Sequence, residues 1–189
     1  MIEMLGVLAI IVVLTVGSIT AYSKAMRRHL LNKQRQQISY ILSAIETHYD
    51  ELKISSTTDS FSTPVFINLG WIPQEMIKDN SVSDVFNNKI SVIGDYTRHF
   101  LHLPIYITNK NAYEQCVNLY QTITQFRSSL WLTFVSRTGS SYSPTNYYYG
   151  DRFCGTGMHC IRDLTLPKIS QLCHACDDYD QCILYLNWK

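Results

Sequence analysis

The first 26 residues contain an uncharged run long enough to cross a lipid bilayer as a helix. Met4 to Ser23 are 20 consecutive residues without a formal charge, and polar groups enter the run only from Thr15 onward. About 20 apolar residues are needed to span some 30 Å of hydrocarbon. Hydroxyl side chains can bond to helix carbonyls, and membrane helices tolerate Gly6 and Gly17. We therefore predict that residues 1–26 form the transmembrane half of a long helix.

One acid, Glu3, stands directly before this run. A secretory signal peptide would have a basic flank and a small-residue cleavage site, whereas the flank here is acidic and no A-x-A site follows. A plain membrane anchor leaves Glu3 unexplained, because a carboxylate at the edge of the hydrocarbon is costly. The third interpretation is an assembly helix, which is used in the membrane and again in a helix bundle outside it. We favour this third interpretation.

Helical periodicity continues beyond the hydrophobic run. No proline occurs before Pro64, and no glycine occurs between Gly17 and Gly70. A continuous helix over residues 2–53 is therefore expected, about 78 Å long at 1.5 Å per residue. Its second half, 27–53, is amphipathic, with Gln37 among the residues of the predicted solvated face. The predicted apolar face consists of Ile38, Ile41, Leu42, Ile45 and Tyr49.

Residues 54–189 read as a globular head, and the turn-rich segment 55–60 is expected to end the helix. A long helix followed by several antiparallel strands predicts the α+β class. The expected elements are, in order, a short helical or extended piece at 65–69, a Gly70 turn, a helix near Pro73, strands around an Asn87–Asn88 turn, a strand at 101–108, a helix from Asn109 to Phe126, an apolar segment at 130–136, a loop at 137–152 and a closing strand at 182–189.

All six cysteines lie in the second half of the chain, which favours disulfides in an exported head. Six cysteines allow 15 pairings. Two short loops suggest pairs of Cys154 with Cys160 and of Cys176 with Cys182. Cys116 and Cys173 then close a long loop, which stabilises by about 4 kcal/mol in the chain-entropy model.

Two other uses of the cysteines compete with disulfides. The spacing of Cys173 and Cys176 in CHAC is that of a redox pair, but such a site calls for a strand before the motif and a helix starting at it. Zinc could be held by Cys173, Cys176 and Cys182 with His159 or His174, although this is not a paired C-x-x-C set. We expect structural disulfides, with no metal and no cofactor.

No motif in the chain predicts catalysis. Gly155-Thr156-Gly157 is too short for a phosphate loop, and no G-x-S-x-G or H-E-x-x-H occurs. The six histidines (29, 48, 99, 102, 159 and 174) are scattered and are expected to be surface or hydrogen-bonded residues. Tyr147-Tyr148-Tyr149 and Trp131 could stack on sugars or neighbouring subunits, but core or interface packing is favoured. A net charge of +1 indicates no nucleic-acid partner.

The opening segment MIEMLGVLAIIVVLTVGSITAYSKAM resembles the N-terminal segment of type IV pilins and pseudopilins. In that family a basic leader ending in Gly is removed by a prepilin peptidase, and the new N-terminus is methylated. Glu3 matches the family's glutamate in position and context. In the head, INLGWIPQEMI and DVFNNKISVIG resemble pilins of this kind from alphaproteobacteria, and AYEQCVNLYQ and SQLCHACDDYDQCILYLNWK resemble their cysteine-closed C-terminal region.

The resemblance implies a structural subunit rather than an enzyme. The subunit would sit in the bacterial inner membrane with its head in the periplasm and then enter an extracellular filament with other copies or related pilins. Glu3, Gly6 and Gly17 would be the assembly and register residues. The alternatives are a minor pilin or type II secretion pseudopilin and, from another class, a membrane-anchored thiol-disulfide oxidoreductase using Cys173 and Cys176.

The basic residues after the hydrophobic run complicate the orientation. The positive-inside rule would place Lys24, Arg27 and Arg28 in the cytoplasm, a reducing compartment that does not suit a disulfide-bonded head. A basic leader upstream of Met1 would reverse this preference. We therefore expect such a leader, together with assembly machinery that extracts the subunit from the membrane.

Overall fold

The computed structural model describes residues 2–54, 62–95, 100–108, 111–137, 147–177 and 182–189. Within these ranges, the side chains of residues 2–17, 52–54, 95 and 137 are not described. The expected turn-rich segment 55–60 lies outside the described residues. All structural statements below concern the described part of the chain.

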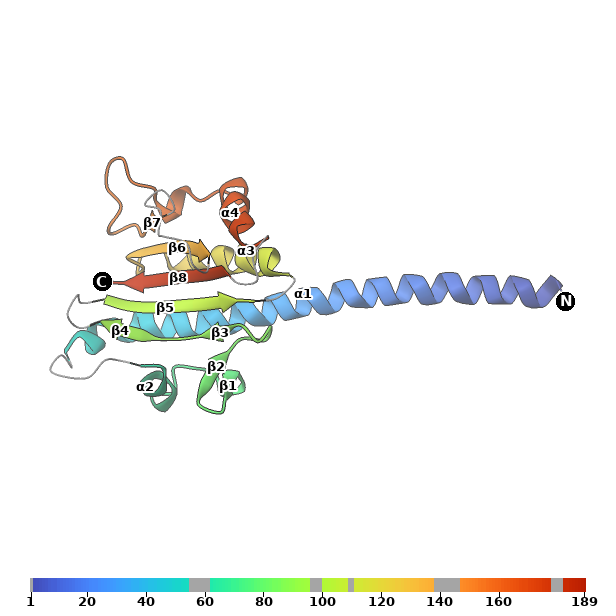
Figure 1. The fold of residues 1–189 in the computed structure, drawn as a ribbon, viewed down its shortest axis with the longest axis horizontal. Helices are drawn as coiled ribbons and strands as arrows, with labels where there is room; N and C mark the ends of the chain where they lie inside the picture. The colour runs from blue at the N-terminus through green and yellow to red at the C-terminus, as the bar shows by residue number, and fades with distance from the viewer. Residues whose placement is uncertain (1, 55–61, 96–99, 109–110, 138–146, 178–181) are drawn as a thin grey trace.

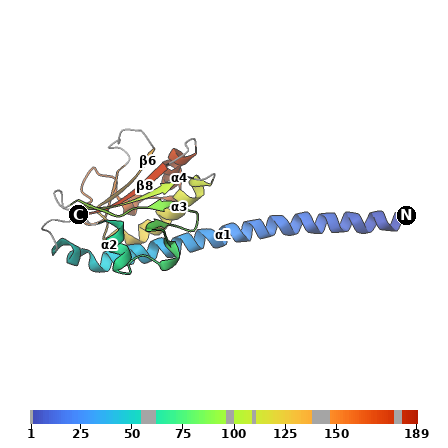
Figure 2. The same cartoon turned by 60° about the horizontal axis from the view of Figure 1, so that its bottom comes forward.

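A single helix, α1 (Ile2–Ile54), accounts for 53 residues and matches the helix predicted over 2–53. Its N-terminal half projects away from the head, and its C-terminal half lies against it (Figures 1 and 2). Residues 18–29 are exposed, whereas Ile38, Ile41, Leu42 and Ile45 are at most 1% exposed. The predicted apolar face is therefore the face that packs on the head.

The head combines short helices with an antiparallel sheet, which confirms the predicted α+β class. Its helical elements are α2 (Thr63–Asn68), η1 (Gln74–Met76), α3 (Ala112–Ile123), η2 (Thr124–Phe126), η4 (Ile161–Asp163), α4 (Leu166–Cys173) and η5 (His174–Cys176). Its strands are β1 (Ile77–Lys78), β2 (Ser81–Ser83), β3 (Lys89–Ile90), β4 (Ile93–Asp95), β5 (Phe100–Ile107), β6 (Leu132–Arg137), β7 (Tyr148–Tyr149) and β8 (Cys182–Trp188).

The sheet runs in the order β1-β2-β3-β5-β8-β6-β7, with β4 paired to β5. All of its strand pairs are antiparallel. The predicted closing strand β8 lies between β5 and β6, so the strand described last in sequence order is central in the sheet. Pro104, in the middle of β5, has no amide hydrogen to donate and lies between the stretches of β5 that pair with β4 and with β3.

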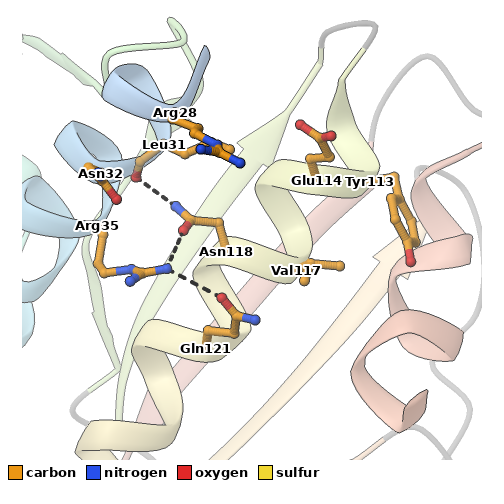
Figure 3. A pocket seen from close by; sticks show the side chains of 9 residues that line it. All are labelled: Arg28, Leu31, Asn32, Arg35, Tyr113, Glu114, Val117, Asn118 and Gln121. Atoms are coloured by element: carbon orange, nitrogen blue, oxygen red, sulfur yellow. Dashed lines mark hydrogen bonds between the residues drawn. The ribbon is translucent and has the colours of Figure 1, made fainter. Parts of the chain in front are cut away.

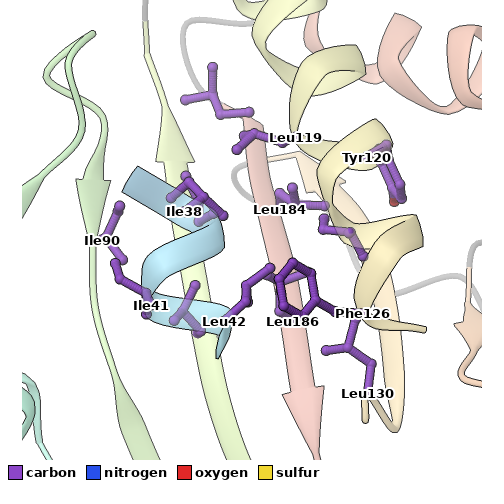
Figure 4. Packing of buried hydrophobic residues seen from close by; sticks show 14 of the residues in the cluster. Ile38, Ile41, Leu42, Ile90, Leu119, Tyr120, Phe126, Leu130, Leu184 and Leu186 are labelled. Atoms are coloured by element: carbon purple, nitrogen blue, oxygen red, sulfur yellow. The ribbon is translucent and has the colours of Figure 1, made fainter. Parts of the chain in front are cut away.

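The core lies between one face of the sheet and the two helices α1 and α3 (Figure 4). Ile38 and Leu42 of α1 face Leu184 and Leu186 of β8, and all four are almost fully buried. Each such side chain contributes about 1.5–3 kcal/mol of burial free energy. Leu119 and other apolar residues of α3 complete the layer, as their predicted spacing indicated. The C-terminal half of α1 is thus part of the head's core.

Several sequence predictions need correction. The helix expected from Asn109 begins at Ala112, and Asn109 itself lies outside the described residues. The piece after Pro73 is the single turn η1. Gln37, placed on the solvated face of α1, is only 5% exposed. The predicted loop 137–152 contains β7, which pairs with β6.

Candidate functional site at the neck of the long helix

The neck is the place where α1 leaves the head, formed by residues 27–37 of α1 and by the residues of α3, of η1 and of the turn between β2 and β3 that bond to them. A pocket of about 360 Å³ opens here between the two helices (Figure 3). Its lining is Arg28, Leu31, Asn32, Arg35, Tyr113, Glu114, Val117, Asn118 and Gln121. Unlike the apolar core beyond it, the neck joins its helices chiefly through side-chain hydrogen bonds.

Asn118 of α3 is the centre of these bonds (Figure 3). Its amide nitrogen donates to the Leu31 carbonyl oxygen at 2.9 Å and to Gln34 Oε1 at 3.0 Å. Its Oδ1 accepts a bond from Arg35 Nη2 at 2.9 Å. Arg35 Nη2 also donates to Gln121 Oε1 at 3.3 Å. One side chain of α3 therefore contacts a full turn of α1, which fixes the rotation of α1 about its axis.

A buried carboxylate continues the network toward the sheet. Asp84, in the turn between β2 and β3, is 4% exposed. Its Oδ2 accepts bonds from Gln34 Nε2 at 2.7 Å and from Asn88 Nδ2 at 2.9 Å, and its Oδ1 accepts the amide hydrogens of Phe86 and Asn88. Asn88 Nδ2 also donates to Gln115 Oε1 at 2.6 Å. Charge-assisted bonds of this kind make a buried carboxylate tolerable.

The same turn holds a second glutamine of α1. Gln37 Oε1 accepts the amide hydrogen of Val85 at 2.9 Å, and its Nε2 donates to Glu75 Oε1 at 2.9 Å. Lys33 Nζ lies 3.5 Å from the same carboxylate. The hydrogen bond from Gln37 and the positive charge of Lys33 lower the pKa of Glu75. The bonds of Gln34 and Gln37 to the head therefore fix the position of α1 along and about its axis relative to the sheet.

An exposed ion pair closes the outer side of the neck. Arg27 pairs with Glu114, and its Nη2 also donates to Asn111 Oδ1 at 3.2 Å. Both partners of the pair are more than 40% exposed, so solvent screens most of their attraction. The buried part of the network, rather than this pair, determines how firmly the helix is held.

The predicted assembly residues lie in the projecting half of α1. Glu3, Gly6 and Gly17 all have helical backbone. Their side chains fall outside the described part of the structure, so their roles stay predictions. From Ser18 onward, in the portion with described side chains, no helix has a stretch both long and apolar enough to cross a membrane.

The cysteines form three disulfides, and no cysteine is free. The pairs coincide with those expected from the sequence: Cys116–Cys173, Cys154–Cys160 and Cys176–Cys182. Cys116–Cys173 ties α3 to α4, and Cys176–Cys182 ties η5 to the start of β8.

This pairing argues against the redox and zinc interpretations of CHAC. Cys173 and Cys176 are bonded to different partners, so they do not form a redox pair with each other. The helix α4 precedes the motif, where a thioredoxin-like site would have a strand. Within the described ranges, no group of three or more His, Cys, Asp or Glu residues could hold a metal ion.

The histidines with described partners are satisfied locally. His48 Nδ1 lies 2.9 Å from Glu51 Oε2, and the His48 ring stacks on the Trp71 ring. His174 Nδ1 lies 2.5 Å from Asp177 Oδ2, and His102 Nδ1 contacts Asn187 Oδ1. His99 lies outside the described residues.

Comparison with known proteins adds no relative: no family model, no curated protein and no solved structure matches this chain. The neck residues Gln34, Asp84 and Asn118 were not singled out from the sequence. One signal was available, because Gln34 precedes Ile38 by four residues and so lies on the predicted apolar face. A glutamine on that face indicates a buried polar partner, although not which one.

Proposed function

We propose that this chain is a structural subunit of a type IV pilus-like filament and that it polymerises through its N-terminal helix. The observation that supports this most directly is the division of α1. One continuous helix buries its C-terminal half in the head and presents its N-terminal half free of the head. The run from Met4 to Ser23 in this half carries no formal charge, so its surface calls for a cover of lipid or of other helices.

In this proposal the uncharged run holds the subunit in the inner membrane, with the head in the periplasm. During assembly the run leaves lipid and packs with the same segment of other copies or of related pilins. Gly6 and Gly17 allow close approach of neighbouring helices. A prepilin peptidase and the filament machinery act on the chain, as the family resemblance implies.

Glu3 would supply the axial register of the filament. In a helix bundle it enters a low-dielectric core, where a carboxylate is tolerated only with a partner. The resemblance identifies that partner as the N-terminal amine of an adjacent subunit. Each new subunit would then stop where this pair forms.

The neck supports the proposal because its bonds couple the orientation of α1 to the orientation of the head. Hydrogen bonds from Gln34 and Arg35 to head residues fix the rotation of α1 relative to the sheet. Heads on a helical array of such stems would therefore share one orientation. A minor pilin or pseudopilin would use the same coupling at the tip of a shorter fibre.

The experiment is to compare Glu3→Ala with Glu46→Ala in filament-producing cells. Glu46 is an exposed acid on the head-bound half of the same helix, so its substitution controls for loss of charge on α1. We expect Glu3→Ala to give normal amounts of membrane-held protein but few incorporated subunits, while Glu46→Ala assembles like the parent. Normal incorporation of Glu3→Ala, measured in sheared filaments, would disprove the register role.

A further inference from the structure

The sheet face turned away from α1 and α3 carries a second pocket, which the proposed function does not use. Side chains alternate between the two faces of a strand. Along β8, Leu184 and Leu186 enter the core, so Tyr185 and Asn187 face the other side. The pocket on this outer face is about 610 Å³ in volume. We call it the aromatic pocket.

Cross-strand neighbours on β5, β8 and β6 build one row of the pocket floor. Tyr185 of β8 is paired with Pro104 of β5 on one side and with Phe134 of β6 on the other. The rings of Tyr185 and Phe134 are stacked, with centroids 4.7 Å apart and planes 14° apart. Tyr147 meets Phe134 edge-on at 5.0 Å and 89°. These rings fix one another, so the wall is preorganised.

The next row along the strands is polar. Asn187 is paired with His102 of β5 and Leu132 of β6, and it is 1% exposed. Its Oδ1 contacts His102 Nδ1, and its Nδ2 donates to the Leu132 carbonyl oxygen at 3.2 Å. A buried amide and an imidazole therefore lie beside the aromatic row. Their contact with each other holds this row of the floor in place next to the aromatic rings.

Trp131 forms part of the rim and is half-buried. Its ring lies 6.0 Å from that of Phe100, and the Lys189 ammonium group lies 5.2 Å from its centroid. Its backbone is held independently of the side chain, since its amide donates to the Asn187 carbonyl oxygen and its carbonyl accepts from Gly150. Tyr106 and Tyr149 bring further phenol groups to the lining.

From these observations we propose that the aromatic pocket binds a neutral oligosaccharide. Its volume lies within the range of small-molecule sites, about 300–1,000 Å³. No Asp, Glu, Lys or Arg is among its described lining residues, and the charged group described at its rim, the Lys189 ammonium, lies over the Trp131 ring. A sugar ring presents polarised C–H groups on its faces and hydroxyls at its edge. The negative faces of aromatic rings suit the C–H groups, and the phenol groups of Tyr106, Tyr149 and Tyr185 suit the hydroxyls.

A second copy of this chain is the competing occupant. A stable protein interface buries at least about 1,000 Å² and closes over a complementary surface. The aromatic pocket is instead a concave site with polar groups at its floor, which is the form that small ligands fill. The sugar-binding proposal is independent of the filament proposal, because neither the neck nor the N-terminal half of α1 contributes a residue to the pocket.

The test uses the full chain in a detergent without a sugar headgroup. Cellotriose, chitotriose and maltotriose are the neutral probes, and trigalacturonate is the acidic one. Saturation-transfer NMR and calorimetry report binding, and circular dichroism reports folding. Trp131→Ala removes a stacking ring, Tyr185→Phe removes only a hydroxyl, and Tyr22→Ala removes an exposed tyrosine of α1 as the matched control.

We expect at least one neutral trisaccharide to bind, with affinity about tenfold weaker in Trp131→Ala and unchanged in Tyr22→Ala. Should Trp131→Ala fail to fold, a weaker affinity in Tyr185→Phe carries the same conclusion. Three results would overturn the proposal: no neutral probe binds at millimolar concentration, only the acidic probe binds, or binding is the same in every pocket variant. Concentration-dependent self-association that is abolished by the pocket variants would instead assign the face to a second copy.

Discussion

Among single residues, the phenol of Tyr120 connects the packing of α3 with the pH dependence of stability. Tyr120 is fully buried in the core, and burial raises its pKa. Burial, assisted by the charge of Asp50, also raises the pKa of Tyr49 to about 12. In the unfolded chain both phenols ionise near pH 10. Between pH 10 and the folded pKa, the unfolded state therefore loses protons that the folded state keeps.

Because the folded state then binds more protons than the unfolded state, the free energy of unfolding falls as the pH rises. The contribution of Tyr120 is fully present below pH 10 and falls by about 1 kcal/mol per pH unit above it. We predict that Tyr120→Phe flattens the fall in the free energy of unfolding between pH 8 and pH 11, measured by urea denaturation. Tyr22→Phe, on the exposed part of α1, should leave the fall unchanged. A parallel pH profile for parent and Tyr120→Phe would contradict the prediction.

At the scale of elements, the join between α1 and the head depends on Asp84. Removing this carboxylate takes away the acceptor of the buried Gln34 side-chain amide and of the Phe86 and Asn88 backbone amides, while Asn88 Nδ2 keeps its bond to Gln115. We predict that Asp84→Ala lowers the free energy of unfolding by about 3 kcal/mol, since each orphaned buried group costs about 1–3 kcal/mol. Hydrogen exchange should also accelerate in residues 30–45 of α1.

The control for this prediction is Asp163→Ala, which removes an exposed carboxylate in η4. It should change the free energy of unfolding by less than about 0.5 kcal/mol. If Asp84→Ala were as mild as its control, the neck network would contribute little to holding α1.

Some features of α1 and of the head could be predicted from the sequence, and others could not. The apolar face of α1 was predictable because its spacing is local, and so was β8. The helix α4 was missed, although Thr165 and Pro167 stand at the positions typical of a helix start. Asp84 and Gln34 are 50 residues apart in sequence, so no local pattern could reveal their bond. The aromatic pocket likewise depends on cross-strand pairing, which joins residues from distant segments.

On the scale of the whole molecule, the disulfides differ in how much of the chain they constrain. Cys116–Cys173 joins residues 57 positions apart, and Cys154–Cys160 joins residues 6 apart. In the chain-entropy model these loops correspond to about 4 and about 2 kcal/mol. We predict that the double variant Cys116→Ala/Cys173→Ala loses more stability than Cys154→Ala/Cys160→Ala, measured by urea denaturation. Equal losses, or the reverse order, would show that packing rather than loop length dominates.

The central position of β8 has a consequence for the order of events during synthesis. Residues 182–188 are made after the other described strands of the sheet, yet they lie between β5 and β6 and against the buried face of α1. The hydrophobic run precedes all of these strands, so it is made while the head still lacks its middle strand. Ile38 and Leu42 must then wait for Leu184 and Leu186 before their face is covered. Until residues 182–188 have been made, β5 and β6 have no strand between them, and a variant truncated before Cys182 should leave this face of α1 uncovered.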